Sequence, residues 1–180
     1  MLFRSRKDHP LLAARIRAAV RRGARVAMLH GAAEDLLMPV AARHTAAPSQ
    51  WPTALAEILV ALLRARSLPA LPGLAGIEPS AQAVQTAELL ASGQSVSILL
   101  GNAVAQHPEY AALLRVAQAL ADACGARLGV LTEAANTVGA WLAGAVPSAG
   151  ALDARGMVEQ PRALYLLLNN EPTLDHAMPA

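Results

Sequence analysis

Residues 6–30 read RKDHPLLAARIRAAVRRGARVAMLH and place an amphipathic helix directly before a short apolar run. The apolar side chains of this helix recur at the spacing of one helical face: Leu12, Ile16, Ala19 and Val20. Pro10 is a typical first helical residue and Gly23 a typical stop signal. The apolar run at 26–29 suits a strand buried on both faces, which is the usual state of strands in parallel sheets.

The same helix-to-strand alternation continues along the chain. Further helices are expected over 53–66, 81–92 and 108–124, with Ser80 as an N-cap and Gly125 as a stop, while residues 31–50 are expected to form a long connection. Strands are expected at four short apolar runs: 25–30, 95–100, 127–131 and 163–168. The alternation predicts an α/β fold, with a mainly parallel, Rossmann-like sheet of about four strands covered by helices on both faces, in a single domain over 1–180.

Composition excludes several classes of protein. Aromatic residues make up 3% of the chain and the net charge is only +2, so stacking platforms and a strong basic patch for nucleic acid are both lacking. Cys124 is the single cysteine, which rules out an internal disulfide and favours a reducing, cytoplasmic setting. The longest apolar stretches are broken before the roughly 20 residues that a membrane span requires, so no direct membrane insertion is expected.

The motifs of common catalytic sites are absent from the sequence. It contains no GxGxxG or GxxxxGK[ST] loop for phosphates, no GxSxG elbow, no HExxH pair, and no second cysteine to hold zinc or a cluster. The five histidines stand alone, next to a proline or near the end of an element, and are interpreted as capping or surface residues: His9, His30, His44, His107 and His176. We therefore expect no catalytic and no metal-binding residue.

Polar residues follow the expected strands, at the ends where open α/β sheets bind ligands. The candidate positions are Gly101, Asn102, Thr132, Glu133, Asn136, Asn169, Asn170 and Glu171. Asparagine and glycine also end strands simply because they tolerate turn conformations. The same residues therefore fit either a ligand site or a set of strand caps, and both interpretations stay open.

Five segments, in order along nearly the whole chain, resemble the large iron–sulfur subunit of bacterial NADH:quinone oxidoreductase (complex I). The most specific is TEAANTVGAWLAGAVP at 132–147; the others are the opening 6–30 segment, EDLLMPVA at 34–41, the 98–129 segment and ALYLLLNNEPTLD at 163–175. The resemblance implies a piece of the C-terminal half of that subunit, which is similar to molybdopterin oxidoreductases. In relatives, a strand ending in a Gly-rich loop precedes the RKDHP segment, so the first strand is expected to be clipped here.

The resemblance implies a structural and interaction role without redox centres, because none of the family's cluster ligands has a counterpart in this sequence. Its expected partners are the rest of the iron–sulfur subunit and other peripheral-arm subunits, with possible self-association, at the cytoplasmic side of the inner membrane. The alternative is a pterin-cofactor or nucleotide-binding domain. Glu171 interrupts the asparagine–proline turn that cofactor-binding relatives have, and carboxylates repel a diphosphate. No cofactor is therefore expected in this chain, whereas the parent subunit carries iron–sulfur clusters.

Overall fold

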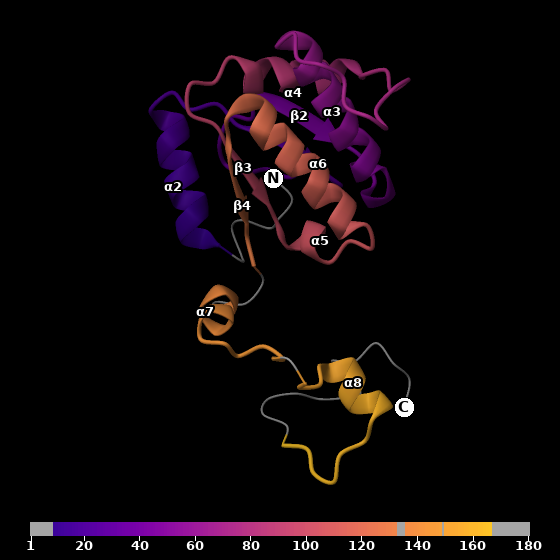
Figure 1. The fold of residues 1–180 in the computed structure, drawn as a ribbon. Coiled ribbons are helices and arrows are strands. Elements are labelled where there is room, and N and C mark those ends of the chain that lie inside the picture. The colour runs from indigo at the N-terminus through magenta and orange to yellow at the C-terminus, as the bar shows by residue number, and fades with distance from the viewer. Residues whose placement is uncertain (1–8, 133–135, 149, 167–180) are drawn as a thin grey trace. The chain divides into compact units, whose positions relative to one another are not determined.

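The computed structural model describes residues 9–132, 136–148 and 150–166. Contacts divide the chain into two compact units, Met1–Ala135 and Asn136–Ala180, and each is described by itself. The α/β class expected from the sequence is confirmed, since helices alternate with short parallel strands (Figure 1). The expectation of one domain over the whole chain stays a prediction.

The first unit contains all of the strands that the structure describes. Its elements are α2 (Pro10–Arg21), β1 (Ala27–His30), β2 (Ala42–Thr45), the 3-10 helix η1 (Pro48–Gln50), α3 (Trp51–Ala65), α4 (Ala81–Ala91), β3 (Ser97–Leu100), α5 (Asn102–Ala105), α6 (Tyr110–Cys124) and β4 (Arg127–Val130). In its described part, the second unit contains α7 (Thr137–Leu142) and α8 (Ala154–Glu159).

The strands form two separate parallel pairs instead of one continuous sheet. β1 pairs with β2 in a register that sets Ala27 opposite Ala42, and β3 pairs with β4 in a register that sets Ser97 opposite Arg127. No hydrogen-bonded ladder joins the two pairs in the described part of the chain. The parallel direction of the strands is confirmed, but the single four-stranded sheet is not seen.

Three of the four expected strands are present, as β1, β3 and β4. The fourth expectation is wrong over its described part, because residues 163–166 form no strand, while 167 and 168 lie outside the described residues. The fourth strand is β2, within the 31–50 segment that was expected to be a connection. Its two inward residues, Ala42 and His44, are buried, and a pattern with one small and one polar residue gives little apolar signal.

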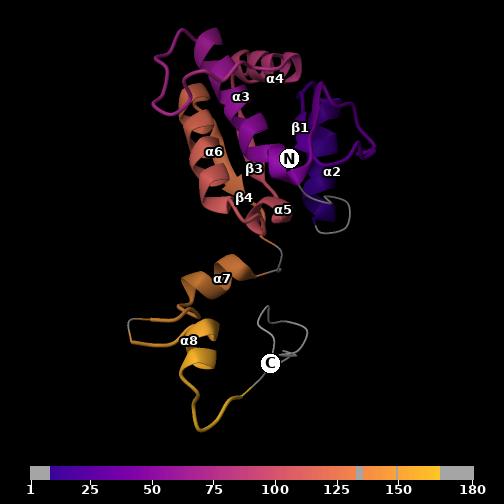
Figure 2. The same cartoon turned by 90° about the vertical axis from the view of Figure 1, so that its right-hand side faces the viewer.

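Helices supply most of the core. α3 packs against both α4 and α6, and nine of its fifteen residues are buried, in agreement with an apolar segment expected to be covered on most sides. The stripe expected on α6 is buried as a set: Leu113, Ala117, Leu120, Ala121 and Cys124. Figures 1 and 2 show α2 and α6 on opposite sides of β3 and β4. Of these two helices, α6 packs against both strands of this pair.

Two helix ends follow directly from local chemistry. The Ser80 hydroxyl accepts a hydrogen bond from the Ala83 amide at 3.3 Å, which satisfies one of the free N–H groups at the start of α4. Gly125 ends α6 in the left-handed conformation with φ of 67°, where a side chain would be strained. None of the described helices combines the length and the apolar character needed to cross a bilayer.

Candidate functional site

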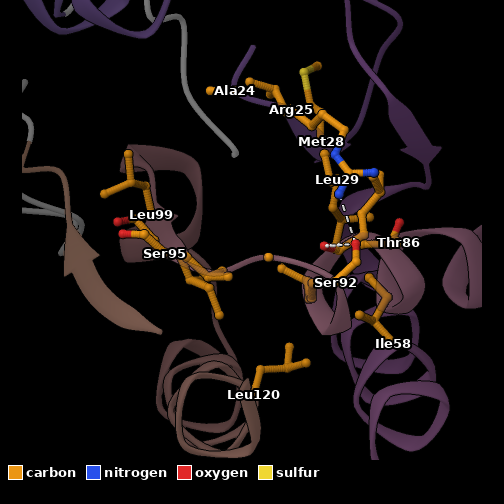
Figure 3. Close-up of a pocket in the computed structure, with 18 of the residues that line it drawn as sticks. Ala24, Arg25, Met28, Leu29, Ile58, Thr86, Ser92, Ser95, Leu99 and Leu120 are labelled. Carbon is orange, nitrogen blue, oxygen red and sulfur yellow. Dashed lines mark hydrogen bonds between the residues drawn. The ribbon is translucent and has the colours of Figure 1, made fainter. Parts of the chain in front are cut away.

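The first unit contains a cavity of about 530 Å³ between the two strand pairs. Residues 24–29 line one side and residues 92–99 line the other. The remaining walls are chiefly aliphatic side chains from four helices: Ile16, Leu55, Ile58, Leu89, Leu90 and Leu120. Figure 3 shows Met28 and Leu29 across the cavity from Ser95 and Leu99, with Ile58 and Leu120 beneath them. We call this cavity the interstrand slot.

The main chain of β1 presents one edge to the slot. The carbonyl oxygens of Val26 and His30 accept hydrogen bonds from the β2 side, at 2.8 and 3.0 Å. In a parallel strand, the N–H and C=O groups of one residue point to one neighbour and those of the next residue to the other. Ala27 and Leu29 therefore direct their main-chain groups to the slot.

β3 presents the matching edge. The carbonyl oxygens of Val96 and Leu100 accept hydrogen bonds from main-chain N–H groups on the β4 side, at 3.0 and 2.7 Å. By the same alternation, Ser97 and Leu99 direct their main-chain groups away from β4 and to the slot. Neither β1 nor β3 pairs with a further strand among the described residues.

The two slot edges run in the same direction. At their amino-terminal ends, the guanidinium of Arg25 donates a hydrogen bond of 2.8 Å to the hydroxyl of Ser92 (Figure 3). At the other end, Leu29 of β1 and Leu100 of β3 pack with Trp51 in one buried cluster. The slot is thus bounded by two parallel strand edges, each four residues long, that are not paired with each other.

The chemistry of the slot favours binding over catalysis. Among the described residues of its lining, Arg25 is the one ionisable residue, and its side chain lies at the end of the slot, where it bonds to Ser92. The polar side chains besides Arg25 are neutral: Thr86, Ser92, Gln94, Ser95 and Ser97. Two open strand edges with aliphatic walls are the features that accept an extended backbone. Sequence patterns did not reveal this site, because each strand was recognised separately without its neighbours.

The strand-end candidates are brought together only in part. Asn102 begins α5 as the second residue after β3, following Gly101, and Thr132 is the second residue after β4. A hydrogen bond of 2.7 Å from the Leu131 amide to the Leu100 carbonyl holds these two chain segments side by side. The Oδ1 atom of Asn102 is buried without a hydrogen-bond partner among the described residues. These residues do not line the interstrand slot.

The other candidates lie in the second unit or outside the described residues. Asn136 belongs to the second unit, where it precedes α7 without a side-chain capping bond. Glu133, Asn169, Asn170 and Glu171 lie outside the described residues. The proposed ligand site therefore stays a prediction, and its described candidates are Gly101, Asn102 and Thr132 in the first unit and Asn136 in the second.

The histidines agree only in part with their interpretation as capping or surface residues. The Nδ1 atom of His107 accepts a hydrogen bond from the Glu109 amide, and its Nε2 atom lies 3.0 Å from the Pro48 carbonyl oxygen. The centroid of the His107 ring is 5.8 Å from the ring centroid of Trp51. The surface interpretation of His44 is wrong, because this residue is 7% exposed within β2. His176 lies outside the described residues. Among the described residues, no three His, Cys, Asp or Glu side chains gather as metal ligands.

Comparisons with models of protein families, with curated proteins and with solved structures found no match for this chain.

Proposed function

We propose that the chain is an interaction domain of the iron–sulfur subunit in the peripheral arm of bacterial NADH:quinone oxidoreductase. The observation that carries the interaction role is the interstrand slot, where the open edges of β1 and β3 border one aliphatic cavity. A strand edge with unpaired N–H and C=O groups is a ready template for pairing with another chain, so such edges favour a partner that completes their hydrogen bonds.

The complex I part of the proposal is supported by the five sequence segments, above all by TEAANTVGAWLAGAVP at 132–147. The parallel strand pairs are compatible with the α/β construction that this resemblance implies. In this role the domain supports electron transfer from NADH to quinone through packing and carries no redox centre itself. It lies at the cytoplasmic side of the inner membrane, against other peripheral-arm subunits.

Co-expression tests this assignment. The full chain would be produced with the cluster-bearing N-terminal half of a bacterial complex I iron–sulfur subunit, and the mixture separated by size-exclusion chromatography. We expect a one-to-one complex with the absorbance of iron–sulfur clusters. An unrelated α/β domain with the same affinity tag serves as the control. Separate elution of the two chains would contradict the complex I assignment.

A second candidate function is a pterin-cofactor or nucleotide-binding domain of a molybdopterin oxidoreductase. The observation in its favour is the buried Oδ1 of Asn102 at the carboxyl end of β3, which has no hydrogen-bond partner among the described residues and lies where open α/β sheets bind ligands. Elemental analysis for molybdenum and fluorescence of pterin released on denaturation decide between the two functions. We expect neither signal, and a stoichiometric amount of either would replace the interaction role by this one.

A further inference from the structure

We infer that the loop between α3 and α4 is a docking segment, which binds an aromatic-lined groove of a partner protein through residues 68–72. These residues read Leu-Pro-Ala-Leu-Pro, and we call them the LPALP segment. Figure 2 shows the loop projecting outward from α3 and α4. The LPALP segment does not line the interstrand slot, so it is a second interaction surface. The inference does not depend on the complex I assignment.

The sequence of the LPALP segment restricts its own backbone. The proline ring holds φ at about −65° in Pro69 and Pro72. A residue before proline is disfavoured in the helical region and becomes extended, which applies to Leu68 and Leu71. These backbone angles are those of a polyproline II helix, which has about three residues per turn. Every residue of the segment except Ala70 is therefore biased to polyproline II by its covalent structure.

The backbone of the LPALP segment is extended and unpaired. Residues 68–71 belong to no helix, strand or turn. Within the described part of the chain, the N–H groups of Ala70 and Leu71 form no main-chain hydrogen bond, nor do the carbonyl oxygens of Pro69 and Ala70. A polyproline II helix likewise has no internal hydrogen bonds, so its main-chain groups stay open to other donors and acceptors.

A tight turn ends the segment. The Leu74 amide donates a hydrogen bond of 3.2 Å to the Leu71 carbonyl. Pro72 and Gly73 occupy both central positions of this turn, and Gly73 has φ of 83°. A type II turn favours these residues and this conformation, and its first central position is extended like polyproline II. Leu74 then packs against the buried cluster that joins α3, α4 and α6, so the turn fixes the end of the segment.

The start of the loop is also held in place. The guanidinium of Arg66 donates hydrogen bonds of 3.1 and 3.4 Å to the carbonyls of Ala91 and Ala123. Arg64 forms an ion pair of 3.2 Å with Glu78, which joins the two ends of the loop. A segment that is already fixed at both ends loses little conformational entropy on binding. The loop therefore presents the LPALP segment in a preorganised form.

The side chains of the LPALP segment form one apolar face. Leu68 and Leu71 are 40% and 38% exposed, and Pro69, Ala70 and Pro72 are exposed as well. In polyproline II, with about three residues per turn and a rise of about 3.1 Å per residue, the two Leu-Pro pairs lie on the same face about 9 Å apart. Ala70 lies between them on the third edge of the helix.

The chemistry of this face identifies the kind of partner. Grooves lined by aromatic side chains bind segments with the proline spacing of Pro69 and Pro72, because the helix is preformed and its ordering costs little entropy. Tryptophan N–H and tyrosine O–H groups in such a groove donate hydrogen bonds. The carbonyls of Pro69 and Ala70, which accept none from the described main chain, can receive them. We therefore expect an aromatic groove with a few such donors.

The first test titrates the full, isotope-labelled chain with a purified SH3 domain and, separately, with a WW domain, followed by two-dimensional NMR. Both domains bind polyproline II segments in aromatic-lined grooves. We expect a Kd of about 100 μM for at least one of them, with shift changes at the amides of Leu68, Ala70 and Leu71. No shift change with either domain up to about 1 mM, or changes confined to other residues, would overturn the inference.

Two matched substitutions test the period of three. Leu71→Lys places a charge on the docking face and should weaken binding at least about tenfold, because a charge is costly in an apolar groove. Ala70→Lys makes the same addition on the outer edge and should leave the Kd unchanged. Equal loss in both variants would indicate general charge repulsion instead of a polyproline II face. That result, or full affinity in Leu71→Lys, would overturn the inference.

A proline pair tests the preformed backbone. Pro69→Ala frees φ at the centre of the docking face and should weaken binding about threefold or more, because the segment must then be ordered on binding. Pro39→Ala, at an exposed proline of the segment between β1 and β2, is the control and should have no effect. Unchanged affinity of Pro69→Ala would contradict recognition of a preformed helix.

Dilution of the chain alone distinguishes a second copy from a separate partner. Shifts of Leu68, Ala70 and Leu71 that depend on the concentration of the chain without any added domain would mean that the segment docks on another copy. That result overturns the inference. Failure of the co-expression test alone overturns only the complex I assignment, because the LPALP segment and its contacts are independent of it.

Discussion

The guanidinium of Arg25 donates a hydrogen bond of 2.8 Å to the hydroxyl of Ser92, across 67 residues of sequence. Arg25 precedes β1, and Ser92 is the C-cap of α4, where its hydroxyl also donates to the Leu89 carbonyl at 3.1 Å. The contact therefore ties one edge of the interstrand slot to the helix that leads into the other edge.

The first prediction is that Arg25 and Ser92 are energetically coupled. Arg25→Met and Ser92→Ala each remove one partner, and each should lower the free energy of unfolding by about 0.5–1 kcal/mol, because the bond is exposed to water. The double variant should lose less free energy of unfolding than the two single variants lose together. Urea unfolding of the four proteins measures this double-mutant cycle, and strict additivity would mean that the bond does not contribute to stability.

The four longest described helices, α2, α3, α4 and α6, were predictable because each has a strong local signal, whereas the short helices α5, α7 and α8 were not expected. α3 is apolar over most of its surface, and α6 has a regular stripe that ends at a glycine. β2 was missed because its four residues contain one buried alanine and one buried histidine as their inward pair. The run at 163–168 was interpreted as a strand because it is apolar, yet a strand also needs a neighbour to pair with, and Leu164 and Leu166 are exposed.

The site was less predictable than the fold because it depends on neighbours that are far apart in sequence. Strand ends could be located, and Asn102 and Thr132 do follow adjacent strands. The slot instead arises because, within the part of the chain that the structure describes, β1 and β3 each pair with a strand on one side only. Apolar periodicity describes which residues are buried, and it does not say which strand edges meet.

The second prediction concerns the N-cap of α4. Ser80→Ala removes the hydroxyl that accepts from the Ala83 amide and should lower the free energy of unfolding by about 1 kcal/mol. Ser97→Ala is the matched control, because the Ser97 side chain is exposed, and it should stay within about 0.5 kcal/mol of the parent. Thermal and urea unfolding measure both. Equal effects of the two substitutions would show that the cap does not stabilise α4.

The third prediction tests where the core lies. Leu62 on α3 is 0% exposed, so Leu62→Ala leaves a cavity and should cost about 2–5 kcal/mol of stability. Leu11 on α2 is 79% exposed, and Leu11→Ala makes the same chemical change with an expected effect within about 0.5 kcal/mol. Urea unfolding at equilibrium compares them. A small loss for Leu62→Ala would mean that α3 is not central to the folded unit.

The fourth prediction is that the chain self-associates through exposed apolar surface. Trp141 and Leu142 on α7 are 68% and 85% exposed, and exposed apolar patches favour association. Trp141→Ser combined with Leu142→Ser should shift the oligomer toward monomer in light scattering across a range of concentrations. Leu11→Ser, on an exposed site of α2, is the control and should leave association unchanged. A parent chain that stays monomeric at high concentration would contradict the prediction.

The fifth prediction concerns the reactivity of Cys124. Its thiol is 6% exposed and donates to the Leu120 carbonyl at 3.0 Å. Burial raises the pKa of the Cys124 thiol above its ordinary value, because the thiolate loses hydration. The thiolate is the reactive form, so the native chain should react with a disulfide reagent at pH 8 far more slowly than the chain unfolded in urea.

The same pKa shift of Cys124 predicts how stability changes with pH. Well below pH 9.0, the ordinary thiol pKa, Cys124 is protonated in both states and contributes no pH dependence. As the pH rises further, the unfolded chain loses this proton first, so the free energy of unfolding falls until the folded pKa is passed. Cys124→Ala lacks the group, and the difference between the two stability curves isolates its effect from other titrations. A difference that stays constant from pH 7 to 10.5, or rapid labelling of the native thiol, would show that Cys124 is not buried as described.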